Sequence, residues 1–239
     1  MARTRRKTAS RQSKGSAIPW WLVWALLAGA LLYVAWINDL LRLPGGLIDP
    51  TSEAAFEAWL DAGEGRADEF SEFQGYLSEQ GVGDVVPPWQ LARVDREYAQ
   101  RCKLDIWRLP PENLWPNIVP ALRLVRDHVE PTMGEVEVQS SYRSPELNVC
   151  AGGAARSRHI SFEALDLLLV NRRTDLDALY PELCAMQEEA GPESGMGLGA
   201  YYDPSDPVYN REGRFHIDAA GYRSWGRSYT RATSICPRD

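Results

Sequence analysis

The chain has 239 residues, of which 44% are hydrophobic and 25% are charged, a composition typical of a folded globular protein. Setting aside the seven basic residues and one acidic residue of the first 43 positions, 19 basic residues face 32 acidic ones, a balance of −13. An acidic domain of this kind repels phosphate backbones, so we expect no nucleic-acid partner.

The N-terminal segment divides into a basic tail and an apolar run. Residues 1–17 carry arginines and lysines without any acid, and residues 18–37 are apolar over about the 20 residues that cross a bilayer as a helix. Because cationic flanks stay in the cytoplasm, the sequence predicts a cytoplasmic tail (1–17), one transmembrane signal anchor (18–43) and an outside location for the rest. A cleaved signal peptide is the alternative, disfavoured because no clear A-x-A site follows the run.

Four cysteines lie beyond the apolar run: Cys102, Cys150, Cys184 and Cys236. In an oxidising compartment an even set of this kind can form two disulfides, by any of three pairings. The sequence does not choose among these pairings. A metal site built from cysteines is disfavoured because no C-x-x-C spacing occurs.

Residues 44–90 are predicted to form a spacer, since Gly, Pro and acidic residues are frequent and only short helices are indicated, at 52–63 and about 67–80. Residues 91–239 are predicted to form one domain, with further helices at about 89–103 and 116–130. His128 lies beside the apolar stripe of the latter helix. A surface or half-buried position is expected for it, because no partner is spaced to chelate a metal with it.

Four strands are predicted, at 135–140, 162–170, 195–202 and 213–220, with a helix at 175–191 between the second and third. This order of elements favours an α+β fold, with a mostly antiparallel sheet packed by helices. In the last strand, Arg214, His216 and Asp218 share one face, while Phe215 and Ile217 point into the core.

Asp166 lies between leucines in the second strand, where burying an unpaired carboxylate is costly. It therefore needs a cation, either a metal ion or an arginine in a structural salt bridge. The chain has three histidines, and His159 and His216 flank Asp166 in sequence. Two imidazoles and a carboxylate are a typical ligand set for zinc with one position left open. We therefore predict a zinc site on the face of the sheet.

Four sequence phrases, "SSYRSPELN", "GGAARSRH", "ALDL" and "FHID…GYRSW", together cover about residues 135–230. They resemble the zinc D-Ala-D-Ala carboxypeptidase family, which includes the vancomycin-resistance D-Ala-D-Ala dipeptidases, murein endopeptidases and phage endolysins, and which shares its fold with the Hedgehog signalling domain. The resemblance implies Zn²⁺ as the cofactor, bound by His159, Asp166 and His216. It also implies hydrolysis of an amide bond in peptidoglycan stem peptides.

The resemblance further implies roles for residues around the metal. Arg143 is expected to stabilise the developing oxyanion and, with Tyr142 and Ser157, to bind the substrate. Without that role Arg143 is a surface arginine at a turn, and Ser157 simply caps a turn. Asp218 is expected to act in catalysis beside a ligand imidazole, and Trp225 to close the domain beneath the site.

Two positions depart from the family pattern. Gly213 stands where the dipeptidases of the family have a catalytic glutamate, so the general base is unassigned; Asp218, Glu212 and, less favourably, Glu163 are the candidates. Phe162 stands where many relatives have glycine. Its ring is expected to reshape the loop or one wall of the substrate pocket.

Two functions follow from these patterns. The first is a membrane-anchored zinc peptidase of peptidoglycan, single-pass in the bacterial inner membrane through residues 18–43, with its domain in the periplasm or outside. It would act as a D-Ala-D-Ala carboxypeptidase or as a murein endopeptidase. The second is a non-catalytic, zinc-containing module that binds or scaffolds the cell wall. The first is favoured because the predicted ligands and Arg143 are all present.

Overall fold

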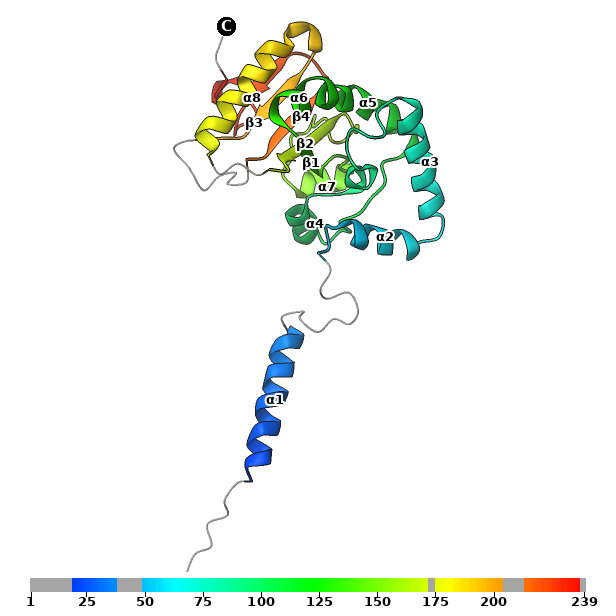
Figure 1. Cartoon of the computed structure of the whole chain (residues 1–239), viewed down its shortest axis with the longest axis vertical. Coiled ribbons are helices and arrows are strands. Elements are labelled where there is room, and N and C mark those ends of the chain that lie inside the picture. The colour runs from blue at the N-terminus through cyan, green and yellow to red at the C-terminus, as the bar shows by residue number, and fades with distance from the viewer. Residues whose placement is uncertain (1–18, 38–48, 172–174, 204–212, 237–239) are drawn as a thin grey trace, which may run out of the picture. The chain divides into compact units, whose positions relative to one another are not determined.

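The computed structural model describes residues 19–37, 49–171, 175–203 and 213–236 (Figure 1). The chain separates into two compact units, residues 1–48 and 49–239. In the first unit, α1 (Trp20–Ile37) occupies most of the predicted apolar run. No helix in the described part of the chain combines the length and apolar character needed to cross a membrane. The predicted span is thus not supported by the structure, and residues 1–17 and 38–43 lie outside the described ranges.

The second unit is built on a five-stranded sheet with strand order β1-β2-β4-β3-β5. The strands are β1 (Val136–Ser140), β2 (Ala164–Leu169), β3 (Gly197–Ala200), β4 (Phe215–Asp218) and β5 (Arg223–Trp225). β3 and β5 run parallel, and the other three neighbouring pairs are antiparallel. The predicted α+β fold is confirmed, with a mixed sheet that is antiparallel except at β5.

Helices cover the core face of this sheet. α5 (Trp115–Leu124) contacts β2 and β4, and α8 (Leu176–Ala190) contacts β3 (Figure 1). The predicted helix at 116–130 continues beyond α5 as a π-helical turn, η3 (Val125–Val129), and α6 (Glu130–Met133). Phe215 and Ile217 are fully buried in the same apolar core as these helices. The opposite face of β4 is therefore left to polar side chains.

The helix predicted at 89–103 is two helices, η1 (Pro88–Ala92) and α4 (Arg96–Cys102). Asp95 causes the break, because its Oδ1 accepts a hydrogen bond from the backbone N–H of Tyr98 and so caps the start of α4. Arg93, just before it, is extended and forms a β-bridge with Trp107. Sequence periodicity alone does not reveal such a cap-driven interruption.

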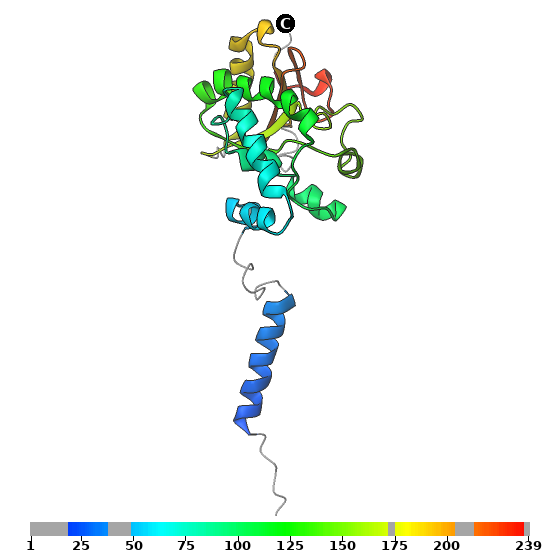
Figure 2. The ribbon, with the colours of Figure 1, turned by 90° about the vertical axis from the view of Figure 1, so that its right-hand side faces the viewer.

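The segment predicted as a spacer belongs to the compact domain from residue 49 onward. It forms α2 (Glu53–Asp61) and α3 (Arg66–Glu79), and both views place α3 beside α5 (Figures 1 and 2). The Phe73 ring, fully buried, lies 5.3 Å from that of Trp115. The apolar faces of these two short helices pack against the rest of the domain. The predicted boundary at residue 91 therefore does not separate compact units.

The four cysteines form two disulfides, Cys102–Cys150 and Cys184–Cys236. The prediction of two bridges is confirmed, and the structure selects one of the three pairings. The first bridge joins α4 to α7 (Pro145–Cys150), a short helix that the sequence analysis did not anticipate. Its start is capped by Ser144, whose hydroxyl accepts from the N–H of Leu147.

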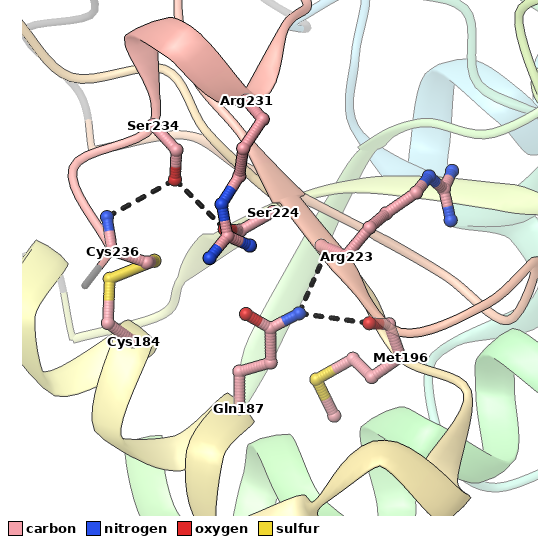
Figure 3. Close-up of a disulfide and its surroundings, with 8 residues drawn as sticks. All are labelled: Cys184, Gln187, Met196, Arg223, Ser224, Arg231, Ser234 and Cys236. Atoms are coloured by element: carbon pink, nitrogen blue, oxygen red, sulfur yellow. Dashed lines mark hydrogen bonds between the residues drawn. A yellow bond between two sulfur atoms is a disulfide. The ribbon is translucent and has the colours of Figure 1, made fainter. Parts of the chain in front are cut away.

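The second bridge ties α8 to the C-terminal segment (Figure 3). Next to it, the side-chain amide of Gln187 on α8 donates to the carbonyls of Met196 at 2.9 Å and Arg223 at 2.8 Å. These bonds hold the short parallel strand β5 beside β3. Strand β5 matters for the site because it carries Trp225 over the polar face of the sheet.

The outer edge of β1 is covered by the segment around η1. The side-chain oxygen of Gln90 accepts from the N–H of Val138 at 2.8 Å, and the guanidinium of Arg93 donates to the Val138 carbonyl. Arg93 also pairs with Glu137 at 2.9 Å. Polar groups of the edge strand are thus satisfied by side chains from the preceding segment.

Candidate metal centre and its cavity

Three side chains converge on the polar face of the sheet. Asp166 on β2 and His216 on β4 are register partners, and His159 lies in the turn before β2. The Nδ1 of His216 lies 3.0 Å from Oδ1 of Asp166, and the Nε2 of His159 lies 3.2 Å from each of these two atoms. All three residues are buried. The predicted ligand set is therefore brought together.

The partners of the two imidazoles orient their ligand nitrogens inward. The Nδ1 of His159 lies 2.6 Å from the carbonyl of Ser141, so it carries the proton and leaves the Nε2 lone pair facing the other two residues. The Nε2 of His216 lies 3.0 Å from Oδ2 of Asp218, which leaves Nδ1 facing inward. Outer hydrogen bonds of this kind commonly fix metal-binding histidines.

The dimensions of this triangle fit zinc. Zinc–ligand bonds of about 2.0–2.1 Å in a tetrahedron place neighbouring ligand atoms about 3.3 Å apart, close to the 3.0–3.2 Å separations of the three atoms. Burial, followed by the charge of Arg143, lowers the pKa of His159 to about 4, which keeps the ring in its neutral, ligating form. The residues present therefore suit a tetrahedral cation with one position open.

Asp166 has an arginine on one carboxylate oxygen and the two candidate metal-ligand histidines on the other. Its Oδ1 faces the histidines, and its Oδ2 accepts a hydrogen bond of 2.6 Å from Nη2 of Arg143. Burial raises the pKa of Asp166, but His159 and Arg143 outweigh it and hold that pKa well below its ordinary value. The Arg143 guanidinium is buried, and its Nε has no hydrogen-bond partner within the described structure.

Asp218 is fully buried and has both oxygens engaged. Besides His216, its oxygens accept hydrogen bonds from Arg223 at 2.7 and 2.9 Å and from the N–H of Ala220 at 2.8 Å. Burial raises the pKa of Asp218, but the bonds from His216 and Arg223 lower it further than burial raises it. This geometry suits a carboxylate that orients the His216 ring better than it suits the general base that was the other role expected for Asp218.

A cavity of about 960 Å³ opens over the three ligands. Of the residues predicted to act there, Arg143, Ser157, Asp218 and Trp225 line it. Tyr142 does not line the cavity, so its predicted role in substrate binding is wrong. Its side chain is buried, and its ring lies 6.4 Å from that of Phe162 in the core. Tyr142 and Arg143 both follow the end of β1 at Ser140, and Tyr142 is buried in the core while Arg143 lines the cavity.

Tyr98, Glu97 and Tyr201 also line the cavity and were missed by sequence reasoning. The Tyr98 ring on α4 lies 5.3 Å from Cζ of Arg143. Tyr201 follows β3, in which the site-facing positions are glycines; a side chain at Gly199 would lie 2.9 Å from Trp225 and His216. The pattern Gly-x-Gly-x-Tyr could have identified Tyr201. Burial raises the pKa of its hydroxyl well above the ordinary value, so it stays protonated.

The structure bears on the unassigned general base at two positions, Gly213 and Glu163. Gly213 has φ of +73°, and a Cβ there would lie 2.7 Å from Cδ2 of Leu179 in the packing against α8. Glu163 pairs with Arg158 at 2.8 Å and does not line the cavity. Glu212 lies outside the described residues.

The structure contradicts the predicted effect of Phe162 on the pocket. Its ring is fully buried, 6.1 Å from the ring of Phe73 on α3, and does not line the cavity. The backbone at Phe162 has φ of +58°, in the left-handed region that favours glycine. The difference from relatives with glycine is thus a backbone and packing feature, because the left-handed turn aims the side chain at α3.

Comparison with protein families supplies an independent finding. The family model of Peptidase M15 matches residues 102–193. The chain is similar to Peptidase M15. The matched part holds Arg143, His159 and Asp166, and it ends before His216, which the β2–β4 pairing brings to the same place. Comparisons with curated proteins and with solved structures found no match.

Proposed function

We propose that this chain is a zinc metallopeptidase that hydrolyses the stem peptides of peptidoglycan. The observation that carries the proposal is the triangle of inward-facing ligand atoms from His159, Asp166 and His216, open to a cavity large enough for a peptide. The similarity of residues 102–193 to Peptidase M15 supports the peptidase class. The bond cleaved is proposed to be either the terminal D-Ala-D-Ala bond or a cross-link.

The chemistry divides between the cofactor and the chain. When bound, zinc supplies Lewis-acid polarisation of the scissile carbonyl and lowers the pKa of a water molecule. Arg143, fixed by Asp166, lines the cavity and supplies positive charge for the oxyanion that develops on the carbonyl oxygen. Tyr201 offers a protonated hydroxyl to the same cavity, and Asp218 holds the ring of His216 in position.

Two carboxylates are proposed for the role of general base. Glu97 lines the cavity from α4 and has no ion-pair partner among the described residues, and Glu212 comes just before Gly213 in sequence. A general base contributes about 10²–10⁴-fold to the rate. Replacing each by glutamine and measuring kcat on one substrate tests both; the variant that loses about this factor with zinc still bound identifies the base.

A non-catalytic wall-binding module is the second candidate function. Gly213 favours it, because the glutamate of the family dipeptidases is missing there and the left-handed backbone packs against α8. Such a module would retain zinc and bind peptidoglycan without changing it.

Mass spectrometry of muropeptides separates these functions. Uncross-linked pentapeptides and cross-linked dimers are incubated with the zinc-loaded chain, with an EDTA-treated sample and with His216→Ala. Loss of one alanine, or conversion of dimers to monomers, in the zinc sample alone supports the peptidase and names its bond. Unchanged substrates with one bound zinc per chain support the binding module.

The site of action is proposed from sequence and from the disulfides. The basic tail at 1–17, the apolar run at 18–37 and two disulfides favour a single-pass protein of the bacterial inner membrane with residues 49–239 in an oxidising compartment. Fractionation of cells followed by protease treatment of spheroplasts tests this. Recovery in the soluble cytoplasm, or protection from protease, contradicts it.

A further inference from the structure

The wall of the cavity carries a charge opposite to that of the domain around it. Beyond residue 43 the chain has a balance of −13, yet six arginines and only three carboxylates line the cavity in its described part. The arginines are Arg143, Arg156, Arg158, Arg214, Arg223 and Arg231, and the carboxylates are Glu97, Asp166 and Asp218. A concave surface of this charge concentrates anionic ligands.

Besides Arg143, which pairs with Asp166 beside the metal ligands, three of these arginines are committed to carboxylates of the chain. The pairs are Arg158 with Glu163, Arg214 with Asp95, and Arg223 with Asp218. Their charge is partly neutralised, and their orientation is fixed by the protein. They shape the wall more than they bind a ligand.

Arg143 and Arg156 differ in what they offer a ligand. Arg143 lines the cavity with its Nη2 bound to Asp166, and its Nε is buried without a hydrogen-bond partner in the described structure and exposes no surface to a ligand. Arg156 is exposed at the cavity and forms no ion pair with any described residue. The guanidinium beside the metal ligands is therefore already paired, whereas no described carboxylate neutralises that of Arg156.

The loop that presents Arg156 is held by the protein. The side-chain amide of Asn148 donates to the carbonyl of Ala154 at 3.0 Å, and the N–H of Ser157 donates to the same carbonyl at 3.0 Å. Cys150, at the start of the loop, is tied to α4 by its disulfide. The backbone of Arg156 is therefore fixed three residues before the ligand His159.

We propose that Arg156 binds a carboxylate of the substrate that is remote from the scissile bond, so that the cavity selects anionic peptides. The inference rests on the proposed peptidase function and deepens it. Arg143 acts at the reacting carbonyl, and Arg156 makes an ionic contact with another residue of the same peptide. The ligand class is a peptide with a free carboxylate outside the bond that is cleaved.

A matched pair of substrates tests the assignment on the zinc-loaded full chain. One is a muropeptide pentapeptide; in the other, the carboxylates outside the scissile dipeptide are converted to carboxamides. We expect Arg156→Gln to raise KM for the first about 10-fold, the scale of one charge-assisted hydrogen bond, and to leave KM for the second unchanged. Arg156→Lys should recover part of the loss. Arg123→Gln, which removes the same charge from an exposed position on α5, should change neither KM.

Equal KM values for the two peptides in the unmodified chain, or an equal effect of Arg156→Gln on both, overturn the inference while the peptidase function stands. If neither peptide is cleaved, the proposed function fails, and isothermal titration of the same two peptides then tests the subsite by itself. Tighter binding of the carboxylate form than of the carboxamide form, with that preference lost in Arg156→Gln, still supports the subsite. Equal binding of both forms rejects it.

Discussion

The Nε2 of His216 lies 3.0 Å from Oδ2 of Asp218, so the opposite ring nitrogen faces His159 and Asp166. We expect Asp218→Asn to weaken zinc binding about 10- to 100-fold, the usual effect of removing a carboxylate that orients a ligand imidazole. Competition with a chromophoric chelator measures the affinity. Asp105→Asn, at an exposed carboxylate, serves as the control. Equal affinities for both variants would show that Asp218 does not orient the ligand.

Zinc should stabilise the folded chain. A ligand that binds only the folded state adds about 2.7 kcal/mol to the free energy of unfolding when its free concentration is 100 times Kd. Thermal unfolding after EDTA treatment and dialysis, with and without added zinc, measures this as a rise in Tm. His216→Ala should abolish the rise. A rise of the same size in that variant would place the stabilising metal elsewhere.

Two replacements of Phe162 should have an unusual order of stability, with glycine above alanine. Removing its buried ring should cost about 3–5 kcal/mol in Phe162→Ala. Phe162→Gly loses the same ring but relieves a left-handed backbone that costs an L residue about 1–2 kcal/mol, so it should be the more stable of the two. Denaturant unfolding of both variants gives the order. Zinc affinity should be unchanged in both, because the ring does not line the cavity.

Placing the glutamate of the family dipeptidases at position 213 should not raise the activity of the chain. The backbone at Gly213 is left-handed, and a Cβ there would lie 2.7 Å from Leu179. Gly213→Glu should therefore destabilise the chain by about 1–2 kcal/mol without raising kcat. Gly213→Ala tests the same strain without the carboxylate. A gain in kcat for the glutamate variant alone would mean that position 213 can supply the base.

The face of the Tyr98 ring should stabilise the guanidinium of Arg143 by a cation–π interaction. A guanidinium over an aromatic ring gains about 0.5–2 kcal/mol, so Tyr98→Leu should lower kcat by about 2- to 30-fold with zinc content unchanged. Tyr98→Phe keeps the ring and should retain the activity. If the Phe variant is as impaired as the Leu variant, the hydroxyl rather than the ring carries the role.

The candidate site was predictable from sequence where residue type and strand alternation determine the outcome. His216 and Asp218 share a face because they are two residues apart on β4, and Asp166 meets His216 because β2 and β4 pair in register. Tyr142 and Phe162 were placed wrongly. Phe162 has a left-handed backbone and Tyr142 lies beyond the end of β1, so residue spacing does not set the direction of either side chain.

Tertiary contacts explain the remaining differences. The segment at 49–90 has the composition of a spacer, and only the surface it covers shows that its aromatic residues belong to the core. For Asp166 the sequence offered a metal or an arginine. The structure places Arg143 on one carboxylate oxygen and, on the other, the two histidines that could hold a metal with it.

The side chains of Gln90 and Arg93 occupy the hydrogen-bonding groups of Val138 on the edge of β1. Another chain cannot add a strand at that position while they are in place. Until the segment at 88–93 has docked, the same edge is open to any extended peptide. Docking of these few residues, which lie outside the Peptidase M15 match, therefore protects the sheet from edge-to-edge association.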